Sequence, residues 1–311
     1  MNSPILIMAP LYEPTLNELE ATYTCHRYWT AADRAALMRE LAGSCKVVVT
    51  NGGRGISGAE MAQLPQLELV SCFGVGVDAI DLGYAREHRI AVTNTPDVLT
   101  EDVADLALSL LLATVRRIPF GDRHVREGKW LKGSMPLTNS LQRRQVGIVG
   151  LGRIGQAIAK RCAAFNTEIG YFGPRAKPGS GYRYFDDVVA LAQWADVLVA
   201  ACPGGAATQK IVSRAALKAL GAQGVFINIA RGSVVDQEAL VEFLVDGTLG
   251  GAGLDVFNNE PNVPEALLGL DTVVLQPHQG SATHSTRAAM GQLAVSNVAA
   301  YAAGKPLLTP V

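Results

Sequence analysis

The sequence has little of several features that mark particular classes of protein. Its formal net charge is only −1 over 311 residues, which argues against a dedicated binder of nucleic acid or another polyanion. No apolar run approaches the ~18 residues of a membrane span, and the longest candidate, 106–115, contains a serine and a threonine. The opening Met-Asn-Ser-Pro has no basic residue, and the apolar stretch 5–8 is too short for a signal peptide. We therefore expect a cytoplasmic protein with no membrane and no nucleic-acid partner.

Cysteines are also few, and their spacing excludes two kinds of site. The sequence has five of them, widely separated and without a Cys-x-x-Cys pair: Cys25, Cys45, Cys72, Cys162 and Cys202. An odd number at such spacing favours neither a disulfide framework nor a zinc site, so we expect no metal. Buried small hydrophobic residues are the better interpretation.

The residues that are present predict an α/β protein. With 49% hydrophobic residues and this length, the chain can bury a core in each of about two domains. Helical stretches, among them 102–115, 213–220 and 236–246, alternate with short β-rich runs, which favours parallel sheets. The candidate strands are 5–8, 46–50, 68–72, 90–93, 145–149, 168–172, 196–200, 225–229, 250–255 and 273–275. Because one doubly wound sheet would not need ten strands, we expect two units, the second centred on 145–275.

The boundary between the units is predicted from turn and helix-start signals. A turn cluster, Asn94 to Asp97, follows a candidate strand, and Thr100 with the two acids after it is a good helix start with a capping hydroxyl. The chain is therefore expected to cross into the second unit near 96–101. Residues 128–139 are predicted to form a loop.

A glycine-rich turn at 147–155 has the spacing of a dinucleotide-binding loop. A β-rich run precedes it and a helical pattern from Ile154 to Arg161 follows, and this context makes the motif specific. In such a loop the first glycine allows a tight turn, the second lets the backbone approach the pyrophosphate, and the third lets helix and strand pack closely. These three are Gly150, Gly152 and Gly155.

The end of the next strand bears on which dinucleotide is bound. Proteins that use NAD usually place an acid there for the ribose 2′-hydroxyl. Here Arg175 and Lys177 occupy that place, which favours a cofactor with a 2′-phosphate. We expect NADP(H) to be preferred and NAD(H) to be possible, and a solvated pair of loop cations remains the alternative.

Three candidate strands of the second half are each followed by one functional group. The segments are 228–232, 255–261 and 276–281, and they offer a guanidinium, a carboxylate and an imidazole. Ligands of open α/β sheets lie at the carboxyl ends of strands. Reduction of a keto acid needs these groups, because hydride addition places negative charge on an oxygen that requires an orienting cation and a proton.

At this point the sequence resembles the D-isomer-specific 2-hydroxyacid dehydrogenases. The resemblance covers nearly the whole chain and rests on segments in the family's order: 69–71, 74–78, 94–96 with Thr100, 150–155, 230–232, 260–261, and 277–278 with Ser281. Segments 171–175 and 304–310 look most like the glyoxylate/hydroxypyruvate and hydroxyphenylpyruvate reductases. The family fold implies two doubly wound parallel-sheet domains. A Rossmann dinucleotide-binding domain, 100–283, would be inserted into a flavodoxin-like substrate-binding domain, 1–99, which 284–311 completes.

The resemblance also implies roles for individual residues. Arg231 would hold the carbonyl oxygen and carboxylate of the substrate, and His278 would donate the proton during reduction. Glu260 would bind the other ring nitrogen and favour the protonated imidazole. The N–H groups of Val75 and Gly76 would bind the substrate carboxylate, and Asp255 would meet the nicotinamide. Further cofactor contacts would come from Arg153, Ile154, Pro203, Thr208, Ala230, His278 and Gly280.

The resemblance implies a substrate class and an assembly as well. We expect reduction of a small 2-oxo acid, hydroxypyruvate or glyoxylate, to the D-2-hydroxy acid, with an aryl pyruvate as the nearest alternative. A formate or phosphite dehydrogenase, or a dinucleotide-sensing corepressor, is a more distant one. A homodimer is expected, and the helix from Glu101 to Arg117 and the segment that contains Trp130 would form its interface.

Overall fold

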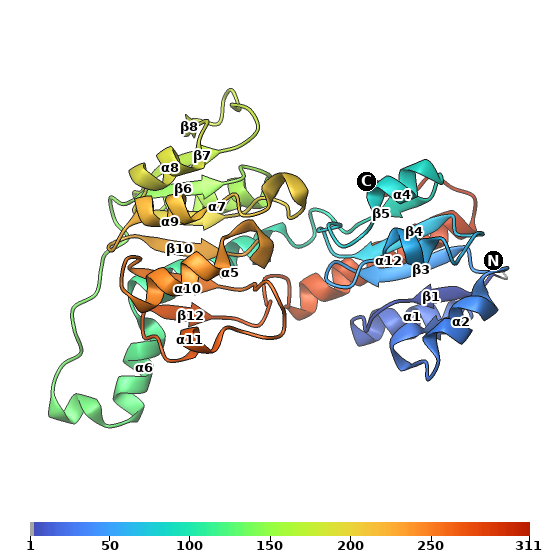
Figure 1. Ribbon diagram of the computed structural model, residues 1–311, viewed down its shortest axis with the longest axis horizontal. Coiled ribbons are helices and arrows are strands. Elements are labelled where there is room, and N and C mark those ends of the chain that lie inside the picture. The colour runs from blue at the N-terminus through green and yellow to red at the C-terminus, as the bar shows by residue number, and fades with distance from the viewer. Residues whose placement is uncertain (1–2) are drawn as a thin grey trace. The chain divides into compact units, whose positions relative to one another are not determined.

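The computed structural model describes residues 3–311, which form two compact units (Figure 1). The first unit comprises the chain up to Leu99 together with Ala282–Val311, and the second comprises Thr100–Ser281. Just after the chain returns to the first unit, the Thr283 hydroxyl accepts a hydrogen bond from the N–H of Thr286 at 3.2 Å and caps the last helix of that unit.

The first unit, in its described residues, is built on a five-stranded parallel sheet with the order β2-β1-β3-β4-β5. This is the flavodoxin-like order that the resemblance implies. The strands are β1 (Ile5–Ile7), β2 (Cys25–Arg27), β3 (Val47–Asn51), β4 (Leu69–Phe73) and β5 (Ala91–Thr93). The helices are α1 (Glu13–Thr22), the 3-10 turn η1 (Tyr28–Thr30), α2 (Arg34–Leu41), α3 (Gly58–Met61), α4 (Leu82–Glu87) and α12 (His284–Ala302).

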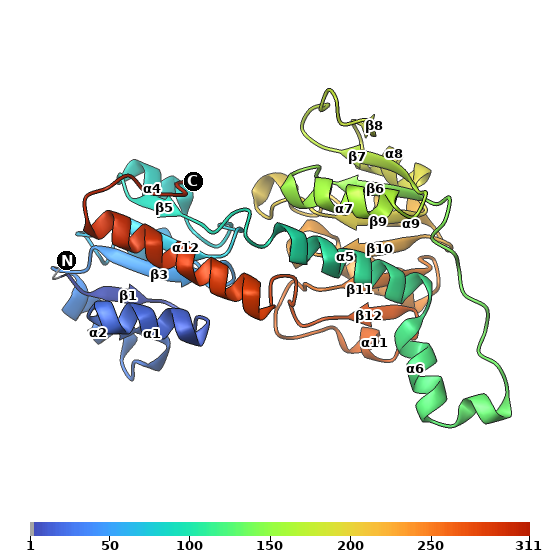
Figure 2. The same ribbon diagram turned by 180° about the vertical axis from the view of Figure 1, so that it is seen from behind.

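Helices cover both faces of this sheet because successive strand residues point to opposite sides. Ile5 and Ile7 of β1 pack with residues of α1 and α12, whereas Leu6 packs with residues of α2 and α3. Figure 2 shows α12 lying along the sheet although it is the last helix of the chain. Burial on both faces explains why the inner strands β1, β3 and β4 consist mainly of apolar residues without polar alternation.

The second unit is built on a seven-stranded parallel sheet with the order β12-β11-β10-β9-β6-β7-β8. From β6 outward this is the Rossmann order with one added strand. The strands are β6 (Gln145–Val149), β7 (Glu168–Phe172), β8 (Arg183–Phe185), β9 (Val197–Ala200), β10 (Val225–Asn228), β11 (Gly251–Leu254) and β12 (Val273–Leu275). The helices are α5 (Thr100–Val115), α6 (Ile118–Arg126), α7 (Arg153–Ala163), α8 (Val188–Trp194), α9 (Arg214–Leu220), α10 (Gln237–Val245) and α11 (Glu265–Leu268), with 3-10 turns η2 (Lys129–Lys132), η3 (Ala206–Thr208) and η4 (Gly232–Val234).

One part of the second unit extends away from its sheet. Figures 1 and 2 show α6 and the chain after it standing apart from the other layers of this unit. The predicted loop at 128–139 contains the short turn η2, so this part of the expectation was incomplete. We call residues 118–137 the arm.

The ten predicted strands are all present, with ends that differ by one residue or less. Two short strands, β2 and β8, were not predicted. Helix α5 begins at Thr100, which confirms the predicted helix start. None of the described helices is both long and apolar enough to cross a membrane.

Candidate active site

The glycine turn of the second unit connects β6 to α7, as its spacing predicts. Gly150 has a left-handed φ of 99°, and a Cβ there would lie 2.7 Å from the Cα of Cys202. A Cβ on Gly155 would lie 2.1 Å from the carbonyl oxygen of Gly150. At Gly152 a Cβ would meet nothing within 4 Å, so open space lies against the backbone there. The first and third glycines are thus required by packing, and the second leaves room for a ligand.

This turn lies where the strand order of the sheet reverses. Strand β6 pairs with β7 on one side and with β9 on the other, so the loops after β6 and β9 border the same crevice. Pro203 follows β9, and its carbonyl oxygen accepts a hydrogen bond from the Thr208 hydroxyl at 2.6 Å. Two predicted cofactor residues therefore border the predicted loop, and their own hydrogen bond fixes the chain between them.

The loop after β7 carries the two predicted cations. It is anchored by the buried Tyr171, whose hydroxyl accepts the N–H of Lys177 at 2.6 Å. The ammonium of Lys177 donates to the carbonyl oxygen of Leu151 at 2.5 Å, inside the glycine turn. Arg175 is exposed. The two cations are thus not equivalent, because one holds the glycine turn and the other points its charge to solvent.

Arg231 follows β10 in a segment that is fixed by backbone contacts. The Asn228 side chain accepts the N–H of Ala230 at 3.0 Å and donates to the carbonyl of Arg231 at 2.9 Å. A Cβ on Gly232 would lie 2.1 Å from the carbonyl carbon of Phe257, so only glycine allows this approach. The close approach brings the segment of Arg231 against the one that leads to Glu260.

Glu260 and His278 form a carboxylate–imidazole pair. Nδ1 of His278 and Oε2 of Glu260 are 2.8 Å apart, and the other carboxylate oxygen accepts the N–H of Phe257 at 3.0 Å. Burial acts to raise the pKa of Glu260, but its hydrogen bonds with His278 and Phe257 and the positive charge of Arg231 outweigh burial and lower it. The carboxylate is therefore charged at neutral pH, and it leaves Nε2 of the imidazole available to a substrate.

Asp255 holds the loop that carries His278. Its carbonyl oxygen accepts the N–H of His278 at 2.9 Å, and its two carboxylate oxygens accept the N–H groups of Gln279 and Gly280 at 2.6 and 2.9 Å. These bonds stabilise His278 at a left-handed φ of 55°, which is uncommon for a residue with a side chain. Burial raises the pKa of Asp255, although the two N–H donors act in the opposite direction. This geometry makes Asp255 a positioning residue for the imidazole.

The first unit has its own glycine turn, after β4. The carbonyl oxygens of Gly74 and Val75 accept hydrogen bonds from the N–H of Thr95 and the side chain of Asn94, both at 2.9 Å. Among the described residues, the N–H groups of Val75 and Gly76 donate to no acceptor. Two adjacent backbone donors are therefore available at the carboxyl end of a central strand.

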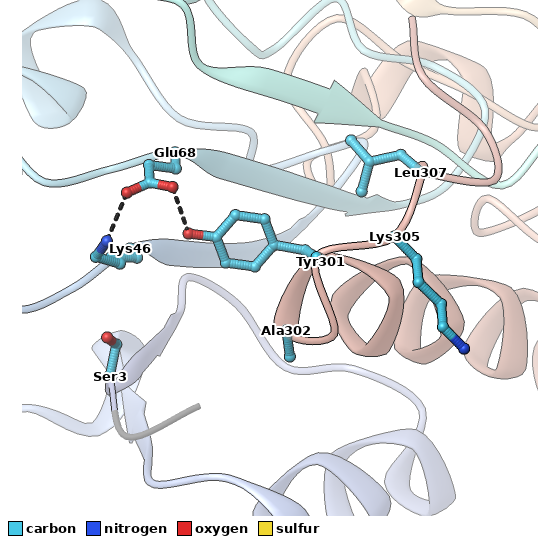
Figure 3. Close-up of a pocket in the computed structure, with 8 residues that line it drawn as sticks. Ser3, Lys46, Glu68, Tyr301, Ala302, Lys305 and Leu307 are labelled. Carbon is cyan, nitrogen blue, oxygen red and sulfur yellow. Dashed lines mark hydrogen bonds and ion pairs between the residues drawn. The ribbon is translucent and has the colours of Figure 1, made fainter.

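A hollow elsewhere in the first unit has a different character. It encloses about 440 Å³ and is lined by residues that include Lys46, Glu68 and Tyr301. Figure 3 shows Lys46 and Tyr301 directed at the two oxygens of the Glu68 carboxylate. Because Lys46 and Glu68 come just before β3 and β4, the hollow lies at the amino ends of the strands, the edge opposite to the one that binds ligands in such sheets.

In the part of the chain that the structure describes, no group of three or more His, Cys, Asp or Glu side chains is placed to hold a metal ion. A Rossmann fold with an open glycine turn, and an arginine, a carboxylate and an imidazole at neighbouring strand ends, define a dinucleotide-dependent oxidoreductase.

Comparison with known proteins gives the family. A family model described as "D-isomer specific 2-hydroxyacid dehydrogenase, NAD binding domain" matches residues 108–280. The chain belongs to the D-isomer-specific 2-hydroxyacid dehydrogenases, which confirms the resemblance and the Rossmann domain.

Individual relatives cover almost the whole chain. A glyoxylate/hydroxypyruvate reductase A of Arabidopsis thaliana is 50% identical over 307 residues, which span 99% of this chain and 98% of the relative. A hydroxyphenylpyruvate reductase of Plectranthus scutellarioides is 48% identical with the same coverage. Among solved structures, an NADPH-dependent glyoxylate/hydroxypyruvate reductase of Sinorhizobium meliloti, in complex with NADP and malonate, has a TM-score of 0.92 and 42% identity. It matches over 100% of this chain and 97% of its own.

Sequence reasoning missed the contacts that hold these side chains in place. Nothing in the spacing of residues indicates that Lys177 reaches Leu151. The three backbone hydrogen bonds of Asp255 were also unforeseen, although an acid directly after a buried strand is a signal that could have suggested them.

Proposed function

We propose that this protein is an NADPH-preferring reductase that converts hydroxypyruvate or glyoxylate to the D-2-hydroxy acid. The observation that carries the proposal is the Glu260–His278 pair next to the segment of Arg231, at the carboxyl ends of β10, β11 and β12. The relatives named glyoxylate/hydroxypyruvate reductase support the substrate class.

The residues of the second unit fit a dinucleotide. The open space at Gly152, the N-terminus of α7 at the exposed Arg153 and the half-buried Ile154, and the crevice before Pro203 suit a diphosphate and an adenosine. Ala230 and Gly280 follow strands at the same edge, and we propose that they and Thr208 contribute backbone or side-chain contacts. When bound, the nicotinamide supplies the hydride.

A side chain of this protein supplies the proton that the reduction requires. We propose that Nε2 of His278 donates it to the carbonyl oxygen of the substrate while Glu260 stabilises the positive imidazolium through Nδ1. Asp255 holds the loop that carries the imidazole of His278. Because its buried carboxylate binds N–H groups of that loop, we propose that Asp255 influences the nicotinamide only through His278 and Gly280.

The substrate is held by charge and by backbone donors. Arg231 offers a planar guanidinium that binds the carbonyl oxygen and the carboxylate together, which a lysine could not do. In the first unit, the available N–H groups of Val75 and Gly76 suit a carboxylate. We propose that the first unit is the substrate-binding domain on this ground.

The choice of cofactor depends mainly on Arg175. Its exposed guanidinium follows β7, where a 2′-phosphate lies in this fold, whereas Lys177 is already committed to Leu151. We therefore expect Arg175 to supply most of the preference for NADPH and Lys177 to contribute mainly by holding the turn.

The test is kcat/KM for hydroxypyruvate with NADPH and with NADH. We expect a preference for NADPH of tenfold or more, about 1.4 kcal/mol, that collapses in Arg175→Ala. Arg183→Ala is the matched control, because its guanidinium carbon already lies 4.7 Å from the ring centroid of Phe185 in the same part of the unit. Equal use of both cofactors by the wild type would refute the 2′-phosphate proposal, and no turnover of any 2-oxo acid would refute the reductase.

An aryl substrate is the second candidate, because the Plectranthus relative is a hydroxyphenylpyruvate reductase. A panel of 2-oxo acids separates the two. We expect kcat/KM to be highest for hydroxypyruvate or glyoxylate, and a higher value for 4-hydroxyphenylpyruvate would replace the small-acid proposal.

We also propose a homodimer that forms through the arm. Leu131 and Leu137 are 94% and 100% exposed, and Ile118, Val125 and Trp130 add further exposed apolar area. Leu131→Glu is expected to give monomers in sedimentation velocity. Val245→Glu, on the exposed end of α10, is the control that should stay dimeric, and a monomeric wild type would contradict the proposal.

Finally, we propose a cytoplasmic location, because all five cysteines are free thiols, which suits a reducing compartment. Cell fractionation tests this.

A further inference from the structure

Arg287 is a half-buried cation without an acidic partner. It lies in the first turn of α12, and its guanidinium carbon is 5.7 Å from the ring centroid of Phe73. Among the described residues, no carboxylate pairs with this guanidinium and no acceptor receives a hydrogen bond from it. Burial lowers the pKa of Arg287, because the charge is partly removed from water. A cation–π contact with phenylalanine is a weak substitute for an anion.

Arg214 shows what a compensated guanidinium looks like in the same protein. It also stacks on a phenylalanine, with 5.0 Å between its guanidinium carbon and the ring centroid of Phe243. It differs in that two of its nitrogens bind the Glu242 carboxylate at 2.9 and 2.7 Å. Arg287 stacks on a phenylalanine ring but has no carboxylate partner, so its guanidinium can still bind an anion.

The neighbour of Arg287 indicates which anion. Phe73 ends β4, and the next residues are the glycine turn in which the N–H groups of Val75 and Gly76 have no acceptor among the described residues. These donors carry partial charges only. A full positive charge on the ring of Phe73, two residues before Val75, would complete a site for a carboxylate by Coulomb attraction.

We propose that Arg287 is a further substrate-binding residue, which draws the carboxylate of the 2-oxo acid to the Val75–Gly76 turn from its platform on Phe73. This inference rests on the proposed function, because it takes the substrate to be a 2-oxo acid. It adds a cation that the resemblance to the family did not assign. Arg287 takes no part in proton or hydride transfer, so its removal should change binding and leave the chemical step nearly intact.

The test uses the full-length protein with Arg287→Met, which keeps an apolar stem against Phe73 and removes the charge. We expect KM for hydroxypyruvate to rise about tenfold, kcat to stay within about threefold, and KM for NADPH to be unchanged. The inhibition constant of oxamate, a carboxylate that resembles the substrate but is not reduced, should rise in parallel. Arg287→Lys should restore most of the affinity, because it restores the charge.

Arg214→Met is the matched control, and all of its constants should equal those of the wild type. A KM and an oxamate constant unchanged in Arg287→Met would overturn the inference. A loss of kcat and of NADPH affinity together with a lower Tm, not rescued by lysine, would overturn it in favour of a structural role. Absence of turnover in the wild type itself would instead refute the proposed function, so the two failures are distinguishable.

Discussion

The two units each end a central strand in a glycine turn, but the turns are stabilised in different ways. In the second unit the turn is fixed from within, because side chains on Gly150 or Gly155 would collide with backbone. In the first unit the turn is fixed from outside, by hydrogen bonds from Asn94 and Thr95. The titratable pair of the proposed reaction, Glu260 and His278, lies in the second unit only. Substitutions in the glycine turn or the Glu260–His278 pair of the second unit should therefore lower stability or turnover. Substitutions in the turn of the first unit should lower substrate affinity.

The largest expected effect comes from His278→Gln. A general acid contributes about 10²–10⁴ to the rate, so kcat for hydroxypyruvate should fall by this factor. Steady-state kinetics measure it, and His88→Gln, at an exposed imidazole of the first unit, is the control. A kcat within threefold of the wild type would remove His278 from the mechanism.

The second effect compares the glycines themselves. Gly155→Ala should lower the free energy of unfolding by up to about 3 kcal/mol, because the added methyl meets the Gly150 carbonyl oxygen at 2.1 Å. Gly152→Ala meets nothing, so it should leave the stability unchanged and weaken only NADPH binding. In the first unit, a Cβ on Gly74 would lie 3.4 Å from the nitrogen of Gly52, so the cost there comes from backbone strain at a φ of 154° without a collision, and it should be smaller than at Gly155. Denaturant melts give the three values, and equal losses would contradict the comparison.

Glu260→Gln tests the Glu260–His278 pair through the turnover rate and through the pH dependence of stability. We expect kcat to fall about tenfold or more, because the imidazolium loses its anionic partner. The lowered pKa of Glu260 means that its carboxylate adds stability above pH 4.5, the ordinary value, and that this contribution is lost as the pH falls through the folded-state pKa. The difference in unfolding free energy between wild type and variant should therefore be largest near neutral pH and vanish in acid. A difference that is independent of pH would show that the carboxylate is not stabilised by its partners.

The smallest effect concerns helix caps, one in each unit. Asp33 caps α2 and Asp187 caps α8, by accepting N–H groups at 2.9 and 2.7 Å. Each change to alanine should cost about 1 kcal/mol. Hydrogen exchange shows where the cost appears, and we expect each variant to speed exchange in its own unit. Faster exchange in both units from either variant would mean that they open together.

Much of the fold could be predicted because its signals are local. Apolar runs identified ten strands, and the strand–turn–helix context identified the dinucleotide loop. Strands β2 and β8 could not be predicted, because Cys25–Arg27 and Arg183–Phe185 are three-residue edge strands with polar members. They form by pairing with β1 and β7, which is a tertiary effect.

The candidate site was predictable to a similar degree and for a similar reason. Residues that follow parallel strands meet at one edge, so Arg231, Glu260 and His278 could be grouped from the sequence. The contacts that orient them were not accessible, because they join positions far apart in the chain. The loop anchored by Tyr171 and the unpaired charge of Arg287 belong to the same class, since each is defined by a neighbour that spacing does not indicate.

The order of the units along the chain has a consequence for synthesis on the ribosome. The second unit is one continuous segment, so it can fold as soon as residue 281 has left the exit tunnel. The sheet of the first unit is made earlier but must wait, because Val295 and Val298 of α12 complete the cluster that covers Ile7 and Val47. During that interval the sheet of the first unit exposes an apolar face, although the second unit is already folded. The first unit is therefore the part on which chaperones should act, although it is the first to emerge.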